Sequence, residues 1–375
     1  MNANEGRCPY ILEVELAAGT RMKVALVFNV KRESTTDIDA VPPSSPLHPQ
    51  SVSTTSLAKD TYAEWDTVDT IDAVASALSM SHDVTLVEAD VKAFETLRTG
   101  GFDIAFNIAE GLNGVSREAH MPAILEFLGL PYTGSDPLTL ATCLDKARTK
   151  EILAYHGVPT SKFVVADTFE IAVEAGLKFP LFVKPLHEGS SKGIFNSSYV
   201  AGPEQLRLEV QRITENYAQP ALVEEYLPGQ EFTVALLGNG NELRVLPPVE
   251  INFGSLPSEA LPVYSYEAKW LWDTKNSPIE IFRCPAKVQE DLGARIDQIC
   301  RKTFEVLRCR DWCRIDLRLD GNGQPNVLEV NPLPGILPDP EEHSCFPMAS
   351  RAAGLSYDQM INSVLNVAAR RLGIA

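Results

Sequence analysis

The chain has 375 residues, of which 45% are hydrophobic and 22% are charged, a composition that is ordinary for a globular protein of two or three domains. Its 50 acidic and 33 basic residues give a net charge of −17, which argues against nonspecific binding to nucleic acid but is compatible with a local basic pocket. No apolar run approaches the length of a membrane span, the first 20 residues lack a secretory signal pattern and the seven cysteines are scattered, so we expect a cytoplasmic protein with reduced thiols and no membrane partner.

The first part of the chain alternates between predicted strands and helices. Apolar runs at 23–28, 83–87 and 103–107 predict strands, and helical periodicity at 67–79 and near 91–97 predicts helices between them. This alternation predicts an α/β fold with an open parallel sheet.

A segment rich in Ser, Thr and Pro interrupts this first unit. Residues 34–60 offer few side chains to a core, so we expect an exposed and flexible insertion here. A predicted helix at 118–128 and a short strand and turn at 130–134 follow. We place this N-terminal domain at residues 1–135.

Two further units are expected after it. The central unit, residues 136–228, begins with a predicted helix from Asp136 to Tyr155, and it also has predicted strands at 179–185 and 221–226 and a helix at 203–214. The C-terminal unit, residues 229–375, has a predicted strand at 231–237, a long helix at 286–307, a hairpin and a final helix at 357–372.

The strongest chemical signal is this predicted hairpin, whose two β-patterned runs flank an Asp-Gly-Asn-Gly turn at 320–323. Because side chains alternate along a strand, Arg314 and Asp316 share one face of the first run, and Glu329 and Asn331 share one face of the second. Two carboxylates and a carboxamide on one face suit Mg²⁺, which takes one or two carboxylates together with substrate phosphates. The alternative, a solvated outer face, explains the charges but not the Pro- and Gly-rich loop that follows.

A Gly- and Ser-rich loop at 187–193 follows a predicted strand that ends near Lys184. Such a loop can bring backbone N–H groups close to phosphate oxygens, although alone it is more often a plain turn. Lys184 favours phosphate binding, because an ammonium group is costly to bury without an anion.

Three other segments have two interpretations each. Lys146 is a surface lysine by local pattern, or else a phosphate ligand. Glu224 and Glu231 either contact a base and a ribose or solubilise edge strands. The aromatic segment 264–270 is either a surface loop with a hydrophobic anchor or a lid that excludes water.

Taken together, these segments resemble the D-alanine–D-alanine ligase family of the ATP-grasp superfamily. The resemblance covers the chain from about Met22 to Leu372, apart from the insertion, and implies an ATP-grasp fold, α+β in its ATP-binding part, with an N-terminal Rossmann-like domain. The motifs occur in the order of the family, and it is the ordered set that is specific: Tyr132-Thr133-Gly134-Ser135, Asp145-Lys146, Val183-Lys184-Pro185, Glu188-Gly189-Ser190-Ser191, Val223-Glu224-Glu225, Gly229 to Thr233, Tyr264 to Trp270, Arg314-Ile315-Asp316, and Leu328 to Asn331 with Pro334-Gly335.

The resemblance implies a role for each matching residue. The residues implied to hold ATP are Lys146, Lys184, Glu188, Ser191, Glu224, Glu225, Leu227 and Glu231. Those implied to bind two Mg²⁺ ions, which Mn²⁺ could replace, are Asp316, Glu329 and Asn331. Those implied in catalysis are Arg314, Ser190, Lys269 and Gly335, with Lys269 near the γ-phosphate and Arg314 and the Gly335 N–H at the tetrahedral oxyanion. Ser344 would hold the carboxylate of the acceptor.

The chain departs from the family pattern where the amino acids should bind. Residues 28–32 replace a Gly-Gly loop and its acidic residue, and Glu64 is our candidate for that carboxylate. Glu110 lies where the family usually has a His-Gly pair, and we predict that it also contacts a substrate. Trp270 stands where a tyrosine is usual, which alters the expected hydrogen bonds around Ser190.

These observations predict an ATP-dependent carboxylate–amine ligase that forms a dipeptide of the D-alanyl-D-alanine type through an acylphosphate, as in peptidoglycan biosynthesis. Its partners would be ATP and amino acids, and a homodimer is compatible with the sequence. One alternative keeps the chemistry but uses another amino acid or amine. A less favoured alternative is a non-catalytic nucleotide-binding regulator, against which the intact Arg314, Asp316, Glu329 and Asn331 set argues.

Overall fold

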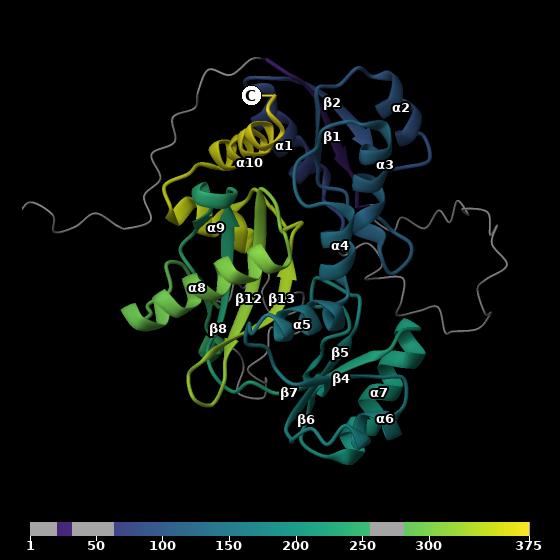
Figure 1. Cartoon of the computed structure of the whole chain (residues 1–375), viewed down its shortest axis with the longest axis vertical. Coiled ribbons are helices and arrows are strands. Elements are labelled where there is room, and N and C mark those ends of the chain that lie inside the picture. The colour runs from purple at the N-terminus through teal and green to yellow at the C-terminus, as the bar shows by residue number, and fades with distance from the viewer. Residues whose placement is uncertain (1–20, 32–63, 256–280, 375) are drawn as a thin grey trace, which may run out of the picture.

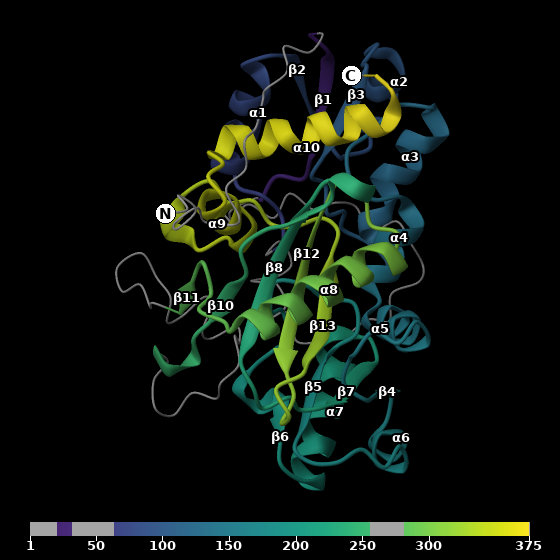
Figure 2. The ribbon, with the colours of Figure 1, turned by 60° about the vertical axis from the view of Figure 1, so that its left-hand side comes forward.

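The computed structural model describes residues 21–31, 64–255 and 281–374, which form three β-sheets with helices packed against them (Figures 1 and 2). The insertion predicted at 34–60 and the aromatic segment 264–270, including Lys269 and Trp270, lie outside the described residues. The sheets occur in successive parts of the chain, and the domain boundaries after residues 135 and 228 remain predictions.

The N-terminal sheet confirms the predicted parallel arrangement. Its strands are β1 (Lys23–Phe28), β2 (Asp83–Glu88) and β3 (Ile104–Asn107), in the order β2–β1–β3. The accompanying helices are α1 (Val68–Ser79), α2 (Ala93–Thr99), the 3-10 helix η1 (Arg117–Ala119) and α3 (His120–Leu128). β1 is buried on both faces, because its alternate side chains pack on α1 on one side and on α2 and α3 on the other.

The second sheet is antiparallel, in the order β4–β7–β5–β6. Its strands are β4 (Phe163–Ala166), β5 (Leu181–Pro185), β6 (Tyr199–Val200) and β7 (Ala221–Glu225). The helices α6 (Phe169–Glu174) and α7 (Pro203–Tyr217) cover one face and share a separate core with it (Figure 1).

The third sheet has six strands, in the order β11–β10–β8–β12–β13 with β9 beside β8. They are β8 (Glu231–Leu237), β9 (Arg244–Val245), β10 (Val249–Ile251), β11 (Phe282–Arg283), β12 (Trp312–Leu319) and β13 (Pro325–Asn331). The helices of this part are α8 (Glu290–Val306), α9 (Cys345–Ala352) and α10 (Tyr357–Leu372), the last with the predicted bounds. The sequence patterns missed α9 and the short strands β9, β10 and β11.

The prediction of a single helix from Asp136 to Tyr155 is wrong. The structure has two helices, α4 (Pro137–Leu144) and α5 (Lys146–Tyr155), separated by Asp145 in an extended conformation. The carboxylate of Asp145 accepts hydrogen bonds from the N–H groups of Ala147 and Arg148 at 3.0 Å, so it caps α5. The helical sequence pattern continues across Asp145, and the start of α5 was therefore not recognised from the sequence.

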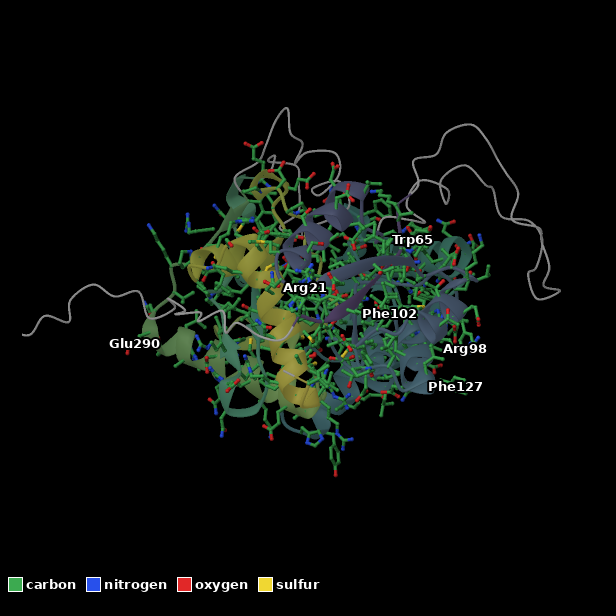
Figure 3. All side chains as sticks on the ribbon, turned by 90° about the horizontal axis from the view of Figure 1, so that it is seen from above. Arg21, Trp65, Arg98, Phe102, Phe127 and Glu290 are labelled. Atoms are coloured by element: carbon green, nitrogen blue, oxygen red, sulfur yellow. The ribbon has the colours of Figure 1, made fainter. Side chains whose placement is uncertain are left out.

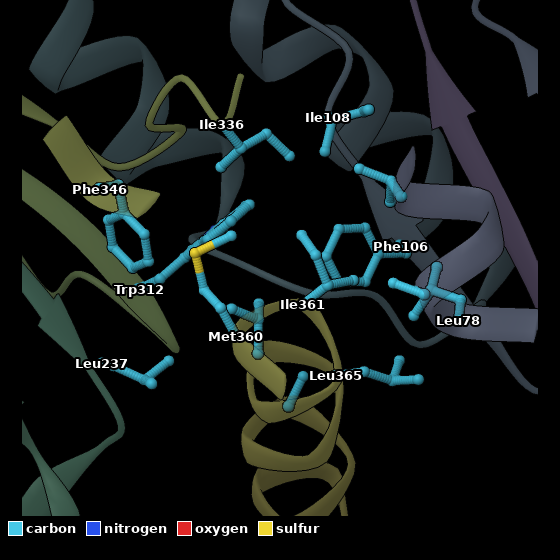
Figure 4. Packing of buried hydrophobic residues seen from close by; sticks show 14 of the residues in the cluster. Leu78, Phe106, Ile108, Leu237, Trp312, Ile336, Phe346, Met360, Ile361 and Leu365 are labelled. Carbon is cyan, nitrogen blue, oxygen red and sulfur yellow. The ribbon is translucent and has the colours of Figure 1, made fainter. Parts of the chain in front are cut away.

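The largest core joins the first and third sheets. The fully buried Trp312 of β12 stacks edge-on against Phe106 of β3 and Phe346 of α9, with ring centroids 5.9 and 5.6 Å apart. Met360 and Ile361 of α10 belong to the same cluster (Figure 4). Viewed from above, Phe127 and Arg98 lie on the side of the N-terminal unit away from α10 (Figure 3).

Asp311 forms a buried polar junction at this contact. Its side chain is fully buried and accepts hydrogen bonds at 2.8 Å from the N–H of Gly134, the amide of Asn239 and the guanidinium of Arg371. Four satisfied bonds to a buried carboxylate fix the geometry of the groups that donate them.

No helix in the described ranges is long and apolar enough to cross a membrane.

Candidate active site

A cavity of about 590 Å³ lies between the three sheets and brings the predicted site residues together. In the part of the chain that the structure describes, every predicted site residue lines it except two: Lys146, which contacts Glu329 of its wall, and Glu188, which precedes the lining residue Gly189. The predicted members of its lining are Glu64, Glu110, Lys184, Ser190, Ser191, Glu224, Glu225, Leu227, Glu231, Arg314, Asp316, Glu329, Asn331, Gly335 and Ser344.

The hairpin of β12 and β13 forms one wall in the register that the sequence predicted. Arg314 pairs with Asn331, and Asp316 pairs with Glu329. Asp316 accepts hydrogen bonds from Thr233 at 2.8 Å, Arg314 at 3.0 Å and Asn331 at 3.2 Å, so three neighbours orient its carboxylate. Burial opposes the charge of Arg314, but Asp316 holds its pKa above the ordinary value, and the guanidinium stays charged.

The donor set of this wall fits a metal ion that also binds a ligand. Within residues 21–31, 64–255 and 281–374, no three acidic, histidine or cysteine side chains converge closely enough to hold a metal by themselves. Asp316, Glu329 and Asn331 supply two carboxylates and a carboxamide on paired strands. These are hard oxygen ligands of the kind Mg²⁺ accepts when substrate phosphates complete its shell.

Two buried lysines contact the carboxylate of Glu224, which also lines the cavity. Glu224 contacts the ammonium groups of Lys150 and Lys184 at 2.8 Å each and accepts a hydrogen bond from Ser161 at 2.8 Å. Burial alone would raise the pKa of Glu224, but the two lysines hold it well below its usual range. Glu224 is therefore an ionised anchor for Lys184, and its carboxylate already has three partners.

Lys146 contacts both the hairpin and the Gly- and Ser-rich loop. Its side chain is 3% exposed, and its ammonium group lies 3.3 Å from Glu329 and donates a short hydrogen bond to the backbone oxygen of Glu188. Burial opposes ionisation of Glu329, but Lys146, Lys184 and Arg314 lower its pKa overall. The basic groups thus converge on the hairpin carboxylates.

The loop from Glu188 to Ser191 is held in an unusual conformation. Ser190 and Ser191 have φ angles of +51° and +60°, in the left-handed region that non-glycine residues rarely adopt. The N–H of Gly189 donates to Glu64 at 2.7 Å, and a Cβ on Gly189 would lie only 2.7 Å from the same oxygen. A side chain at position 189 would therefore displace either the loop or the Glu64 carboxylate.

Arg117 is a site residue that the sequence reasoning missed. Its guanidinium donates to both carboxylate oxygens of Glu64, at 2.8 and 2.9 Å, and to the backbone oxygen of His187 at 2.9 Å. Arg117 therefore links the carboxylate of Glu64 to the backbone at the start of the Gly- and Ser-rich loop. No local signal could have identified Arg117, because Glu64 is 53 residues away in the sequence.

Arg318 and Lys150 were also missed, although the sequence carried a signal for both. Arg318, 5% exposed, donates to Glu231 at 3.0 Å and to the hydroxyl of Tyr226 at 2.7 Å. It follows Asp316 by two residues in the strand, and Lys150 follows Lys146 by four in α5, so each shares a face with a predicted site residue.

Three carboxylates of the N-terminal unit line the cavity and have no hydrogen-bond or ion-pair partner for their side chains within residues 21–31, 64–255 and 281–374. Asp66 precedes α1, Glu110 follows β3 and Glu118 belongs to η1. Burial raises the pKa of Asp66 to about 7, and burial together with Glu64 raises that of Glu118 to about 8. Burial and the neighbouring carboxylate of Glu118 raise the pKa of Glu110 well above its usual value.

Ser344 lines the cavity at the start of α9. Its hydroxyl donates to the backbone oxygen of Gly335 at 2.9 Å, which links the loop after β13 to the helix. A Cβ on Gly335 would meet nothing within 4 Å, so open space adjoins this part of the backbone.

Comparisons with known proteins match most of the chain. The family model described as D-ala D-ala ligase C-terminus matches residues 151–366. An uncharacterized protein, y4sG, of Sinorhizobium fredii is 40% identical over 311 residues, which cover 80% of this chain and 87% of that protein. A D-alanine–D-alanine ligase of Bordetella petrii is 34% identical over 300 residues, covering 78% of this chain and 84% of the relative.

Solved structures agree in fold at lower identity. A D-alanine–D-alanine ligase of Bacillus anthracis complexed with ATP superposes with a TM-score of 0.66 at 20% identity, covering 93% of this chain and 98% of that one. The VanG D-Ala:D-Ser ligase of Enterococcus faecalis gives 0.66 at 22% identity, covering 93% and 100%. These likenesses confirm the expected ATP-grasp fold. The extent of the family match and the 34% identity over most of both proteins show that the chain belongs to the D-alanine–D-alanine ligase family, whose members are ATP-dependent ligases.

Proposed function

We propose that this protein joins two amino acids into a dipeptide at the expense of ATP, by the chemistry of D-alanyl-D-alanine formation. One observation carries the proposal: a single cavity combines the Arg314, Asp316, Glu329 and Asn331 face with the buried Lys184 and with the Gly- and Ser-rich loop at 189–191. Such a set can neutralise phosphates and the reacting carboxylate together.

ATP would lie between the second and third sheets. Lys146 and Lys184 would offset negative charge on its phosphates, with Lys184 held in place by Glu224. Glu231, which Arg318 orients, is the proposed partner of the ribose hydroxyls. Glu225 and Leu227 would border the adenine base. Asp316, Glu329 and Asn331 would hold Mg²⁺, which supplies further neutralisation of the phosphates when bound.

The chain's own residues would then assist acyl transfer. A carboxylate is a poor acyl donor at neutral pH, so the proposed step transfers the γ-phosphoryl group of ATP to it and releases ADP. An amine attacks the resulting acylphosphate, and phosphate leaves. Arg314 and the N–H of Gly335 would stabilise the negative oxygen of the tetrahedral intermediate, and the 188–191 loop would exclude water.

Isotope transfer tests this proposal directly. The purified protein is mixed with ATP, Mg²⁺ and amino acids labelled with ¹⁸O in the carboxylate. We expect ADP release that depends on amino acids, a product with the mass of a dipeptide, and ¹⁸O in the released phosphate. ADP release that is indifferent to amino acids, or unlabelled phosphate, would rule out acylphosphate formation. Tight ATP binding without turnover would favour the alternative of a non-catalytic nucleotide-binding regulator.

A further inference from the structure

Arg117 joins two parts of the molecule that have separate cores. It belongs to η1 of the N-terminal unit, whereas His187 and Gly189 belong to the Gly- and Ser-rich loop that follows β5 of the second sheet. The guanidinium of Arg117 donates to the backbone oxygen of His187 at 2.9 Å and to both carboxylate oxygens of Glu64 at 2.8 and 2.9 Å. Glu64 in turn accepts from the N–H of Gly189 at 2.7 Å. The loop is thus attached to the N-terminal unit on both sides of residue 188.

The N-terminal unit fixes both members of this ion pair. Gly111, which follows β3, donates its N–H to the side chain of Asn29 at 2.8 Å and accepts from the indole of Trp65 at 2.9 Å. Trp65 is the neighbour of Glu64 in the chain, and a Cβ on Gly111 would lie only 2.4 Å from the backbone oxygen of Arg117. One turn beyond the carboxyl end of β3 therefore positions Glu64 and Arg117 together.

Arg117 is a desolvated group that keeps its charge. Its side chain is 8% exposed. Burial opposes its ionisation, but the carboxylates of Glu64, Glu188 and Glu118 hold its pKa above the ordinary value. Separating Arg117 from Glu64 would leave two buried charges uncompensated, so the pair acts as one group.

The loop that this pair holds needs support from outside. Ser190 and Ser191 line the cavity with φ angles of +51° and +60°, a conformation that persists only where the surroundings fix it. Lys146 and Gln219 each hold one backbone group of the loop. Arg117 and its carboxylate partner hold two more, and they alone of these four side chains come from the N-terminal unit. They therefore keep the loop against that side of the cavity.

We propose that Arg117 is a positioning residue that keeps the Gly- and Ser-rich loop closed on the N-terminal unit while the acylphosphate exists. Water competes with the amine for this intermediate. If water attacks its carbonyl carbon, the oxygen of the water enters the carboxylate, phosphate leaves with the bridging oxygen, and a proton is released. ATP is then consumed without a dipeptide. The role rests on the proposed ligase function and adds to it the residue that protects the intermediate.

Hydrogen exchange measured by mass spectrometry tests the closure without any amino acid. The whole chain and its variants are compared with Mg²⁺ and the non-hydrolysable ATP analogue adenylyl imidodiphosphate bound. We expect Arg117→Gln to accelerate exchange of the amides at 187–191 by at least about tenfold, the size of one charge-assisted hydrogen bond, and to leave α10 unchanged. Arg117→Lys should accelerate it less, because an ammonium group keeps the charge but lacks the planar fork.

Two outcomes of this experiment would overturn the proposal. One is unchanged loop exchange in folded Arg117→Gln. The other is acceleration that spreads equally through α3 and α10, because a merely structural ion pair would loosen the whole N-terminal unit.

Arg98→Gln is the matched control. Arg98 is an exposed arginine of α2 that pairs with Glu95 at the surface, and this variant should exchange like the parent protein. Thermal unfolding of each variant verifies folding. If Arg117→Gln does not fold because Glu64 loses its counter-charge, the double variant Arg117→Gln with Glu64→Gln removes both charges and is measured in its place, with the same expected result.

The ratio of ADP released to dipeptide formed tests the protection of the intermediate. With D-alanine, the parent protein should release about one ADP per dipeptide and Arg117→Gln several, because water then reaches the acylphosphate. A ratio that stays at the parent value while loop exchange accelerates would overturn the protective role. If D-alanine does not stimulate ADP release from the parent protein, the ligase function is refuted for D-alanine, and the exchange experiment still decides whether Arg117 closes the loop.

Discussion

Asp316 lies directly opposite Glu329 across the β12–β13 hairpin, and the register shifts by one residue immediately after Asp316. The irregularity leaves Leu328 without a counterpart in the register, between Glu329 and Val327. A bulge of this kind bends a strand and re-aims its side chains. Both carboxylates line the cavity at the point where the ladder is interrupted.

Glu329→Gln is expected to lower turnover by roughly three orders of magnitude, because a metal ion neutralising phosphates contributes several kcal/mol to the transition state. The fold should persist, since the amide keeps the shape of the side chain. ADP release at saturating Mg²⁺ and thermal unfolding are the measurements. Glu290→Gln, at an exposed position in the first turn of α8, is the control. Near-normal activity of folded Glu329→Gln would contradict the metal assignment.

Lys184→Ala should weaken ATP binding by about tenfold or more, and amino acid binding much less, because a charge-assisted contact to phosphate is lost. It should also destabilise the fold by roughly 3 kcal/mol, since Glu224 loses one of its two buried cations. Calorimetry with a non-hydrolysable ATP analogue and denaturant unfolding measure these effects. Lys178→Ala changes an exposed lysine and should alter neither quantity. An unchanged nucleotide affinity in Lys184→Ala would exclude the phosphate role.

Gly189→Ala should lower kcat/KM by about tenfold to a hundredfold with little loss of stability. The new Cβ would lie 2.7 Å from a carboxylate oxygen of Glu64, so either the loop or that carboxylate has to move. Steady-state assays check the prediction. In Gly202→Ala the added Cβ meets nothing within 4 Å, so this variant should behave like the parent protein. Equal activity of both variants would show that the Glu64–Gly189 contact is dispensable.

The stability of the ligand-free protein should fall as pH rises, in part through Asp66. Burial raises its folded pKa to about 7, whereas the unfolded value is about 3.9. The folded state therefore binds the proton more tightly, and the stabilisation is complete below the unfolded pKa and lost as pH rises through 7. Asp66→Asn should reduce the drop in Tm between pH 5.5 and 8.5, while Asp72→Asn, at an exposed carboxylate of α1, should not. If the Tm of Asp66→Asn and that of the parent protein depended on pH in the same way, the raised pKa of Asp66 would be disproved.

The elements that the sequence predicted well are those with strong local patterns. The bounds of α10 follow from its period, a capping box between Ser356 and Gln359, and Gly373 with a φ of +70° at its end. The pairing of Arg314 with Asn331 follows from alternation and a short turn. The break at Asp145 was missed because a capping residue inside a continuous helical pattern is locally ambiguous.

The partners of the site residues could not be predicted in the same way. Glu224 was expected to face a base or a solvent-exposed edge, but its partners Lys150 and Lys184 reach it from separate elements. Arg117 acquires its role from Glu64, and neither has a motif that points to the other. Long-range pairs of this kind are set by packing, which the sequence does not display locally.

The buried junction at Asp311 has a consequence for how the protein admits its ligands. Bonds from Gly134, Asn239 and Arg371 converge on one carboxylate, and Trp312 fills the space beside them, so the first and third sheets behave as one rigid frame. The second sheet has a core of its own and carries Lys184. We therefore expect opening for substrate entry and product release to involve rotation of residues 163–225 against that frame.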